Sequence, residues 1–123
     1  MKNSVFISIP WFTPAYKAGG PIQSIFNLVN SYNDKIFYKI FCGYEDVDNS
    51  LINVNRFNSW EQFNSNTEVY YNRNKSLLQT IKFYKTIPTD DYLFIIGIYS
   101  LKYNIIPLFF SRSKNKILSV RGM

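Results

Sequence analysis

The chain has 123 residues, of which 46% are hydrophobic and 19% aromatic, enough for one ordinary domain with a core, so a disordered chain is excluded. Its 14 Lys and Arg residues against 8 Asp and Glu residues give a net charge of +6, which favours anionic partners such as nucleotide sugars, lipid-linked diphosphates, anionic membrane surfaces or nucleic acid. The basic residues are scattered along the chain, with clusters only at Lys82 and Lys85 and at Arg112, Lys114 and Lys116, and this argues against a dedicated nucleic-acid surface.

The residue types that are missing or rare exclude further classes of site. The chain has no histidine, so a histidine-dependent catalytic triad or an ordinary zinc site cannot be built from it alone. The single cysteine, Cys42, cannot form an internal disulfide, and its apolar surroundings in the sequence predict a core residue in a reducing compartment. We see no signal-peptide pattern and no apolar run near the roughly 20 residues of a membrane span. A cytoplasmic location is therefore expected.

The first segment, residues 4–32, predicts a strand, a glycine turn and a helix. Residues 5–9 are mostly β-branched or aromatic and are closed by Pro10, which removes a hydrogen-bond donor from a strand. Gly20 and Pro21 fit the beginning of a helix, as its cap and first turn. The apolar residues that follow recur with the period of one helix face; they are Ile22, Ile25, Phe26 and Val29.

The glycine pair in this segment has two interpretations. Gly19 and Gly20 lack side chains, and the free N–H groups at a helix start would stabilise a diphosphate or carboxylate there. Alternatively, the glycines serve a tight turn for backbone reasons only. The spacing matches neither the three-glycine dinucleotide motif nor a phosphate-binding loop ending in Gly-Lys-Ser/Thr.

The middle of the chain predicts two more strands and a long connection. Residues 36–42 form an apolar, β-branched and aromatic strand, which after a helix implies a parallel crossover. Residues 43–66 are predicted to be a long loop that can hold a helical turn over residues 59–63, capped by Ser59. Residues 68–71 are a short candidate strand whose partner the pattern does not identify.

A second amphipathic helix is predicted over residues 75–87, capped by Asn74 or Ser76 and ended by Pro88. Its expected inward residues are Leu77, Leu78, Ile81 and Tyr84. Asp90 and Asp91 are interpreted as a turn rather than as metal ligands, so no metal site is predicted.

The last part of the chain predicts strand, helix and strand. Residues 92–98 are an unbroken apolar run, typical of a strand covered on both faces. A third helix is expected from Ser100 to about residue 112, but Pro107 requires either a kink or a start near the proline. Residues 116–120 form the last strand. The expected buried side of this helix consists of Ile105, Ile106, Phe109 and Phe110.

Helices placed between successive strands predict an α/β fold with a doubly wound, mostly parallel sheet of Rossmann-like type, as a single domain over residues 1–123. In such a sheet, ligands gather at the carboxyl ends of the strands near the switch in strand order. Three segments leave such ends: residues 10–20, 97–100 and 121–123. They are expected to converge in space.

Three short motifs occur in these segments. Trp11-x-x-Pro14-x-x-Lys17-x-Gly19-Gly20-Pro21-Ile22-x-Ser24-Ile25-x-Asn27-Leu28 resembles the opening of family 4 glycosyltransferases, the retaining GT-B enzymes of bacterial polysaccharide assembly. Gly97-Ile98-Tyr99-Ser100 is similar to the family's turn after the fourth strand, and Ser119-Val120-Arg121-Gly122-Met123 is similar to its Ser-Pro-Arg-Gly-Met segment, with Val120 in place of proline. The motifs stand in the family's order and span nearly the whole chain.

The resemblance implies that the chain is the N-terminal, acceptor-side half of a hexosyltransferase of this type. Such an enzyme transfers a sugar from a nucleotide-sugar donor to a glycan or lipid-linked acceptor, with retention of configuration, no required metal and no cofactor. The donor-binding domain that carries the family's acidic residues is C-terminal and is absent from these residues, so the fragment alone is expected to be inactive. A peripheral contact with the anionic inner face of the cell membrane is a further expectation, and a nucleic-acid partner is not expected.

The resemblance places six residues at the substrate site, and each has a structural alternative. Gly19 and Gly20 would lie in the interdomain cleft near the diphosphate or the acceptor. Arg121, next to Gly122, could hold an anionic oxygen, or could be a solvated or ion-paired arginine. Tyr99 and Ser100 could bond a sugar hydroxyl, while capping of the third helix explains Ser100 equally well.

Three further residues in or beside the matched segments bear on the site. Trp11 and Tyr16 could stack on a sugar, although core packing is the preferred interpretation for Trp11. Ile96 stands where some relatives have a polar residue, so no catalytic role is assigned at that position, and the catalytic residues stay unknown.

Two functions from other classes stay open. One is a non-catalytic basic α/β module that binds an anionic membrane or a protein partner. The other is a different nucleotide-binding α/β enzyme.

Overall fold

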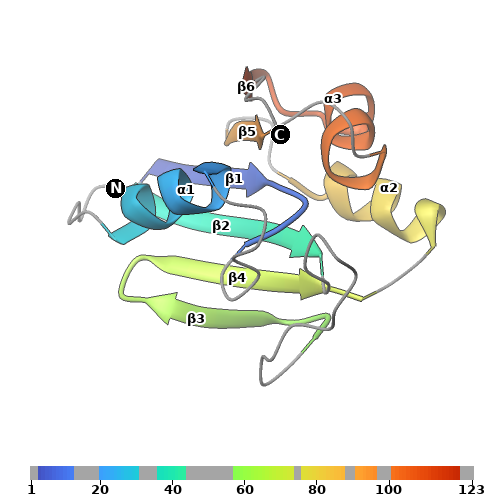
Figure 1. Cartoon of the computed structure of the whole chain (residues 1–123). Helices are drawn as coiled ribbons and strands as arrows, with labels where there is room; N and C mark the ends of the chain where they lie inside the picture. Colours follow the sequence, from blue (N-terminus) through green and yellow to red (C-terminus); the bar gives the residue numbers. More distant parts are fainter. Residues whose placement is uncertain are drawn as a thin grey trace.

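The computed structural model describes residues 3–12, 20–30, 36–43, 57–73, 76–87, 91–96 and 101–119. Within these residues strands and helices alternate along most of the chain (Figure 1). In chain order the elements are β1 (Asn3–Ser8), α1 (Gly20–Asn30), β2 (Ile36–Gly43), β3 (Trp60–Asn64), β4 (Thr67–Asn72), α2 (Leu77–Lys85), β5 (Tyr92–Ile96), the π-helix η1 (Leu101–Ile105), α3 (Ile106–Phe110) and β6 (Asn115–Ser119).

The six strands form one sheet in the order β3-β4-β2-β1-β5-β6. Every neighbouring pair is parallel except β3 and β4, which are antiparallel. Numbered along the chain, the five parallel strands stand in the order 3-2-1-4-5, so the strand order reverses between β1 and β5. The predicted α/β class with a mostly parallel sheet is confirmed at this level, and the switch in strand order lies between β1 and β5.

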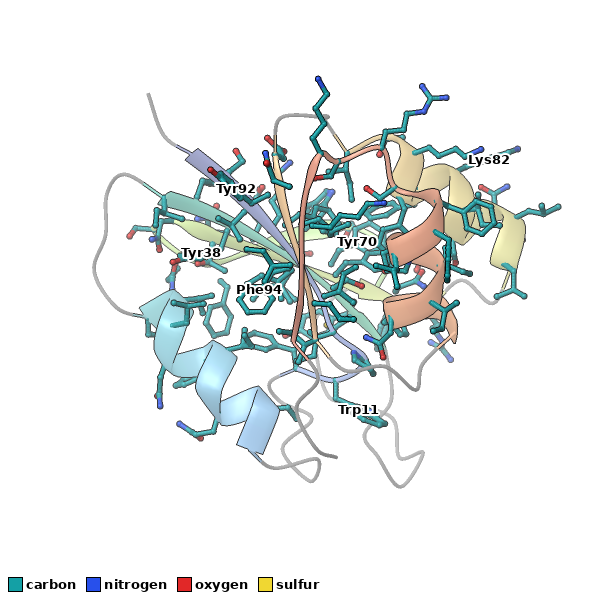
Figure 2. The ribbon with its side chains drawn as sticks, turned by 90° about the horizontal axis from the view of Figure 1, so that it is seen from above. Trp11, Tyr38, Tyr70, Lys82, Tyr92 and Phe94 are labelled. Atoms are coloured by element: carbon teal, nitrogen blue, oxygen red, sulfur yellow. The ribbon has the colours of Figure 1, made fainter. Side chains whose placement is uncertain are left out.

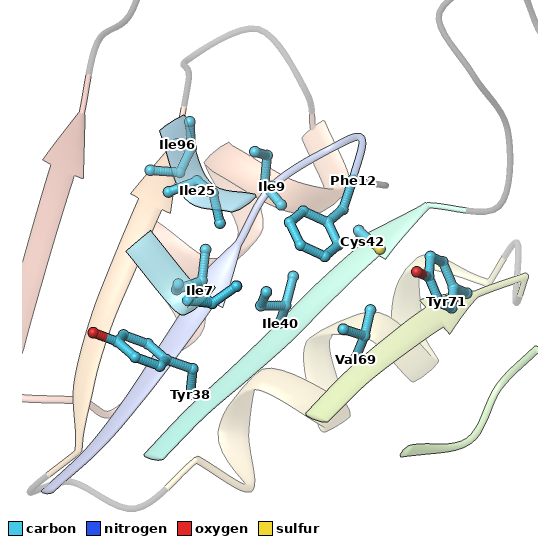
Figure 3. Packing of buried hydrophobic residues seen from close by; sticks show 11 residues of the cluster. Ile7, Ile9, Phe12, Ile25, Tyr38, Ile40, Cys42, Val69, Tyr71 and Ile96 are labelled. Carbon is cyan, nitrogen blue, oxygen red and sulfur yellow. The ribbon is translucent and has the colours of Figure 1, made fainter. Parts of the chain in front are cut away.

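Two apolar cores form on the two faces of the sheet, because successive side chains of a strand point to opposite sides. The face under α1 holds Ile7, Ile40 and Cys42, with Ile25 and Val29 from the helix (Figure 3). The opposite face holds Phe6, Phe41, Leu93 and Ile95 and is covered by α2 and α3. The sheet is therefore a layer between helices, as the apolar strand runs predict.

Most of α1 agrees with the sequence pattern. Ile22, Ile25 and Val29 are buried and Phe26 is half-buried, while Gln23, Asn27 and Asn30 are exposed. Gly20 and Pro21 are the first two residues of the helix. Cys42 is buried as predicted, and Trp11 packs against the core under α1, which confirms the core interpretation of that residue.

The long loop predicted over residues 43–66 is wrong in its last part. Residues 60–64 form strand β3, not a helical turn, and β3 is the antiparallel neighbour of β4. Trp60 pairs across the strands with Tyr70, with ring centroids 5.4 Å apart. This contact between strands stabilises β3, and a pattern read along one segment cannot show it. The other side of β4 pairs in parallel with β2, which identifies the partner that the sequence left open.

The capping prediction for α2 is confirmed, but half of its predicted inward face is wrong. The Ser76 side chain accepts a hydrogen bond from the backbone N–H of Gln79. Tyr84 is buried and Ile81 is half-buried, whereas Leu77 and Leu78 are 44% and 70% exposed. Thr80 is buried in their place, since its hydroxyl donates to the Ser76 carbonyl within the helix.

The prediction that the third helix starts near Pro107 is confirmed. Residues 101–105 form a π-helix, and α3 begins at Ile106 with the proline in its first turn. The predicted burial of Phe109 and Phe110 is wrong, since they are 72% and 42% exposed. A π-turn holds more residues than an α-turn, so it rotates the side chains that follow relative to a continuous α-helix. The predicted burial of Ile106 is confirmed, Ile105 is half-buried, and Pro107 joins Ile106 on the buried side.

The end strands differ from their predicted bounds by one or two residues. β1 covers Asn3–Ser8 and β6 covers Asn115–Ser119, against predicted ranges of 5–9 and 116–120. β5 covers Tyr92–Ile96, and residues 97–98 of its predicted range lie outside the described residues. In the part of the chain that the structure describes, no helix has the length and apolar character that crossing a membrane requires.

Candidate functional site

The strands that lead into the three motif segments end in one row at the carboxyl edge of the sheet. Ser8, at the end of β1, is the register partner of Ile95 in β5. Ile95 is in turn the register partner of Leu118 in β6. The chain therefore leaves β1, β5 and β6 from neighbouring points, beside the switch in strand order (Figure 1). This is where an open parallel sheet gathers its ligands.

Of the six predicted site residues, only Gly20 lies within the described residues. It is the first residue of α1. Because α1 connects two parallel strands, its N-terminus lies at the carboxyl edge, as the prediction requires. The other predicted site residues, Gly19, Tyr99, Ser100, Arg121 and Gly122, lie outside the described residues, and their roles stay predictions.

A buried hydroxyl cluster lies directly behind this edge. Ser8 Oγ donates to the carbonyl oxygen of Tyr103 at 2.5 Å and lies 2.7 Å from the hydroxyl of Tyr84. Since the single Ser8 proton is used on the carbonyl, the Tyr84 hydroxyl must donate to Ser8 Oγ. Desolvation by burial raises the pKa of Tyr84 well above its usual 10.0, so this hydroxyl keeps its proton.

The same cluster fixes both ends of the segment that carries Tyr99 and Ser100. On one side, Asn104 Nδ2 donates to the carbonyl of Ile96 at 2.5 Å, and both residues are almost fully buried. On the other side, Ser8 holds the carbonyl of Tyr103 within η1. Single-turn π-helices are frequent at functional sites. Sequence analysis missed Ser8 and Asn104; the signal available was a polar residue inside or just after an apolar run.

The first residues after β1 are held against β2 by a close backbone approach. The Gly43 N–H donates to the carbonyl of Pro10 at 3.0 Å. A Cβ on this glycine would lie 2.9 Å from the same oxygen and 3.3 Å from the Tyr103 hydroxyl. That hydroxyl is also 3.4 Å from Asn72 Nδ2, at the end of β4. Only glycine at position 43 therefore allows the first loop, β2 and η1 to meet here.

A separate hollow of about 220 Å³ lies between α2 and strands β2 and β4. Its volume is below the roughly 300 Å³ at which small-molecule sites begin, so it is too small for a nucleotide sugar. The residues that line it are Phe41, Tyr70, Asn72, Gln79, Thr80, Lys82, Phe83 and Thr86.

The polar side chains that the structure describes behind this edge are buried and bond to the protein itself. Ser8, Tyr84 and Asn104 supply neutral hydroxyl and amide groups, and among the described residues no three side chains of the His, Cys, Asp or Glu type gather as metal ligands. Glu68 and Asp91 lie toward the amino ends of the parallel strands. Glu61 lies near the carboxyl edge, because β3 is antiparallel and the preceding Trp60 is in register with Tyr70, Phe41 and Ser8. This arrangement can orient the loops that touch a substrate.

Comparison of the chain with protein-family models, with curated proteins and with solved structures finds no match.

Proposed function

We propose that this chain is the N-terminal, acceptor-side domain of a GT-B glycosyltransferase of the family 4 type, with a Rossmann-like sheet. The complete enzyme would transfer a sugar from a nucleotide-sugar donor to a glycan or lipid-linked acceptor in cell-surface polysaccharide synthesis. One observation carries the proposal: the three segments with family-like motifs follow β1, β5 and β6, whose ends share one register row. From such a row, segments far apart in sequence would border one site.

The proposed roles follow from the chemistry of the motif residues. Gly20 begins α1, and together with Gly19 it would leave room for a diphosphate or acceptor beside the helix N-terminus. Arg121, next to Gly122, would bind an anionic oxygen with its fork of donors. Tyr99 and Ser100 would bond sugar hydroxyls, in a segment whose flanks are fixed by Asn104 and Ser8.

The test is sugar transfer by the complete reading frame that contains these residues. A panel of labelled nucleotide sugars is offered with detergent-solubilised membrane lipids and glycans as acceptors. We expect transfer by the complete protein and none by residues 1–123 alone. Turnover by the 123 residues, or a complete protein that neither binds nor transfers any nucleotide sugar, would contradict the proposal.

A pair of arginine variants distinguishes a loss of binding at the proposed site from a general effect of lost positive charge. Arg121→Ala is expected to lower kcat/KM by about a hundredfold, the size of a lost charge-assisted bond to a substrate anion. Arg112→Ala removes the same charge at a position just after α3. This end of α3 lies away from the carboxyl edge, so the variant should retain its activity in detergent. Equal losses in both variants would remove Arg121 from the site.

The two rival functions have their own signatures. Saturable binding of a free dinucleotide to residues 1–123 would favour another nucleotide-binding α/β enzyme. Binding to anionic vesicles by a complete protein without any transferase activity would favour a non-catalytic module.

A further inference from the structure

The outer surface of α2 and α3 combines exposed apolar side chains with basic ones. The two helices pack side by side on the face of the sheet opposite α1 (Figures 1 and 2). Phe109 and Leu78 are 72% and 70% exposed, the two largest values among the large hydrophobic residues of the described ranges. We call α2–α3 surface the set Leu78, Lys82, Lys85, Phe109, Phe110 and Arg112, all of which are exposed.

The basic residues of this surface come together through the topology. Both α2 and α3 lead from one parallel strand to the next, so both run from the carboxyl edge toward the amino edge of the sheet. Lys82 and Lys85 are in the last turn of α2, and Arg112 follows the end of α3. The last turns of the two helices therefore both lie toward the amino edge of the sheet, and Phe109, Phe110 and the three cations lie in or directly after these turns. Figure 2 shows Lys82 extending outward from α2.

The charge of the chain is concentrated in the part that forms this surface. Residues 69–123 carry nine Lys and Arg against two Asp, whereas residues 1–68 carry five against six. No acidic residue occurs within residues 76–87 or 101–119, which contain both helices. Nothing in either helix neutralises the exposed cations.

We propose that the α2–α3 surface docks on an anionic lipid bilayer. Basic side chains bind anionic headgroups while exposed aromatic and leucine side chains enter the boundary between headgroups and acyl chains. The exposed residues of the two adjacent helices form the outer surface of the protein on this side of the sheet. A bilayer can bind such a surface without a shape-complementary pocket. The carboxyl edge lies at the other end of these helices, so docking leaves the proposed substrate site uncovered. This inference does not depend on the proposed sugar transfer.

The experiment is flotation of the full chain with two kinds of vesicle, one of phosphatidylcholine alone and one of equal parts phosphatidylcholine and phosphatidylglycerol. We expect binding to the anionic vesicles only, weakened by high salt. A triple variant, Lys82→Gln with Lys85→Gln and Arg112→Gln, should have a partition coefficient about a hundredfold lower. Each lost charge is expected to lower the partition coefficient about fivefold. Phe109→Ser should also reduce it, whereas Leu28→Ser, on α1 across the sheet, should leave it unchanged.

Circular dichroism and thermal melting verify that each variant is folded. Binding of the wild-type chain to neither vesicle, or equally to both, would overturn the proposal. The proposal would also be overturned if the triple variant still bound the anionic vesicles as the wild-type chain does. Sedimentation that reveals a dimer lost in Phe109→Ser, without vesicle binding, would assign the surface to a second copy instead.

Discussion

At the scale of single residues, the carboxyl edge depends on Ser8, which serves two buried partners. Its hydroxyl donates to the Tyr103 carbonyl and accepts from Tyr84. Ser8 is fully buried, so water cannot replace either bond. Ser8 therefore holds α2 and η1 against the end of β1.

Ser8→Ala should therefore cost more stability than the loss of one hydrogen bond. We expect the free energy of unfolding to fall by about 2 kcal/mol, because the substitution removes the acceptor of one buried hydroxyl and the donor to a buried carbonyl. Tyr84→Phe removes one bond and leaves the other, and should cost about 1 kcal/mol. Urea denaturation of both single variants and the double variant measures their coupling. Strictly additive losses would show that the two hydroxyls do not interact.

A second residue-scale prediction concerns alkaline pH. Burial raises the pKa of Tyr84 and Tyr71 above their usual 10.0, and that of the Cys42 thiol well above 9.0. The folded chain keeps these protons, while the unfolded chain releases them near the usual values. Stability is therefore complete below about pH 9 and is lost as pH rises, by up to about 1.4 kcal/mol per pH unit for each group.

Denaturation curves between pH 8 and 11 measure this slope. Tyr84→Phe removes one of the three groups and should make the loss above pH 10 less steep, in addition to lowering the whole curve. An unchanged slope in this variant would contradict the assignment.

At the scale of elements, β3 shows where sequence patterns fail. Apolar and polar residues alternate poorly along this segment, and Asn58, which precedes it, has a positive φ of 59°. Its stability comes from elsewhere: Trp60 packs on Tyr70 and Phe83, and the Asn58 N–H donates to the Tyr71 carbonyl. Such contacts join residues far apart in sequence, so no local period predicts them.

The left-handed turn at Asn58 is testable. Asn58→Val should destabilise the chain by about 1–2 kcal/mol more than Asn58→Gly, because a β-branched residue is strained at positive φ. Both variants lose the bond from the Arg73 N–H to Asn58 Oδ1, so their difference isolates the backbone. Urea titration followed by tryptophan fluorescence in a Trp11→Phe background, where Trp60 is the remaining tryptophan, reports on β3 directly. Equal stability of the two variants would show that β3 does not require this conformation.

The helices show a related limit. The 3.6-residue period correctly predicted the buried face of α1, which is regular along its length. It failed for α3, since five residues of π-helix precede the helix and change the direction of its side chains. It also failed for Leu77 and Leu78 at the start of α2, which are exposed; Leu78 belongs to the α2–α3 surface.

At the scale of the whole molecule, the sequence predicted the class of fold because parallel strands that are buried on both faces have nearly continuous apolar sequences. It could not predict the strand order, which depends on contacts between strands, nor the network of Ser8, Tyr103 and Asn104 that unites three elements. The six predicted site residues were found by resemblance, and Gly20 is the one of the six that lies among the described residues.

The proposed function depends on one geometric relation: the chain beyond β6 must border the same edge as the start of α1. Spin labels on Gln23→Cys and Arg121→Cys measure this relation, with Gln23→Cys and Asn115→Cys as the control pair. Cys42 is buried and should not take the label. Six residues of extended chain rise about 20 Å. We therefore expect a clearly shorter distance from Gln23 to Arg121 than from Gln23 to Asn115. An equal or longer distance to Arg121 would contradict a common substrate site.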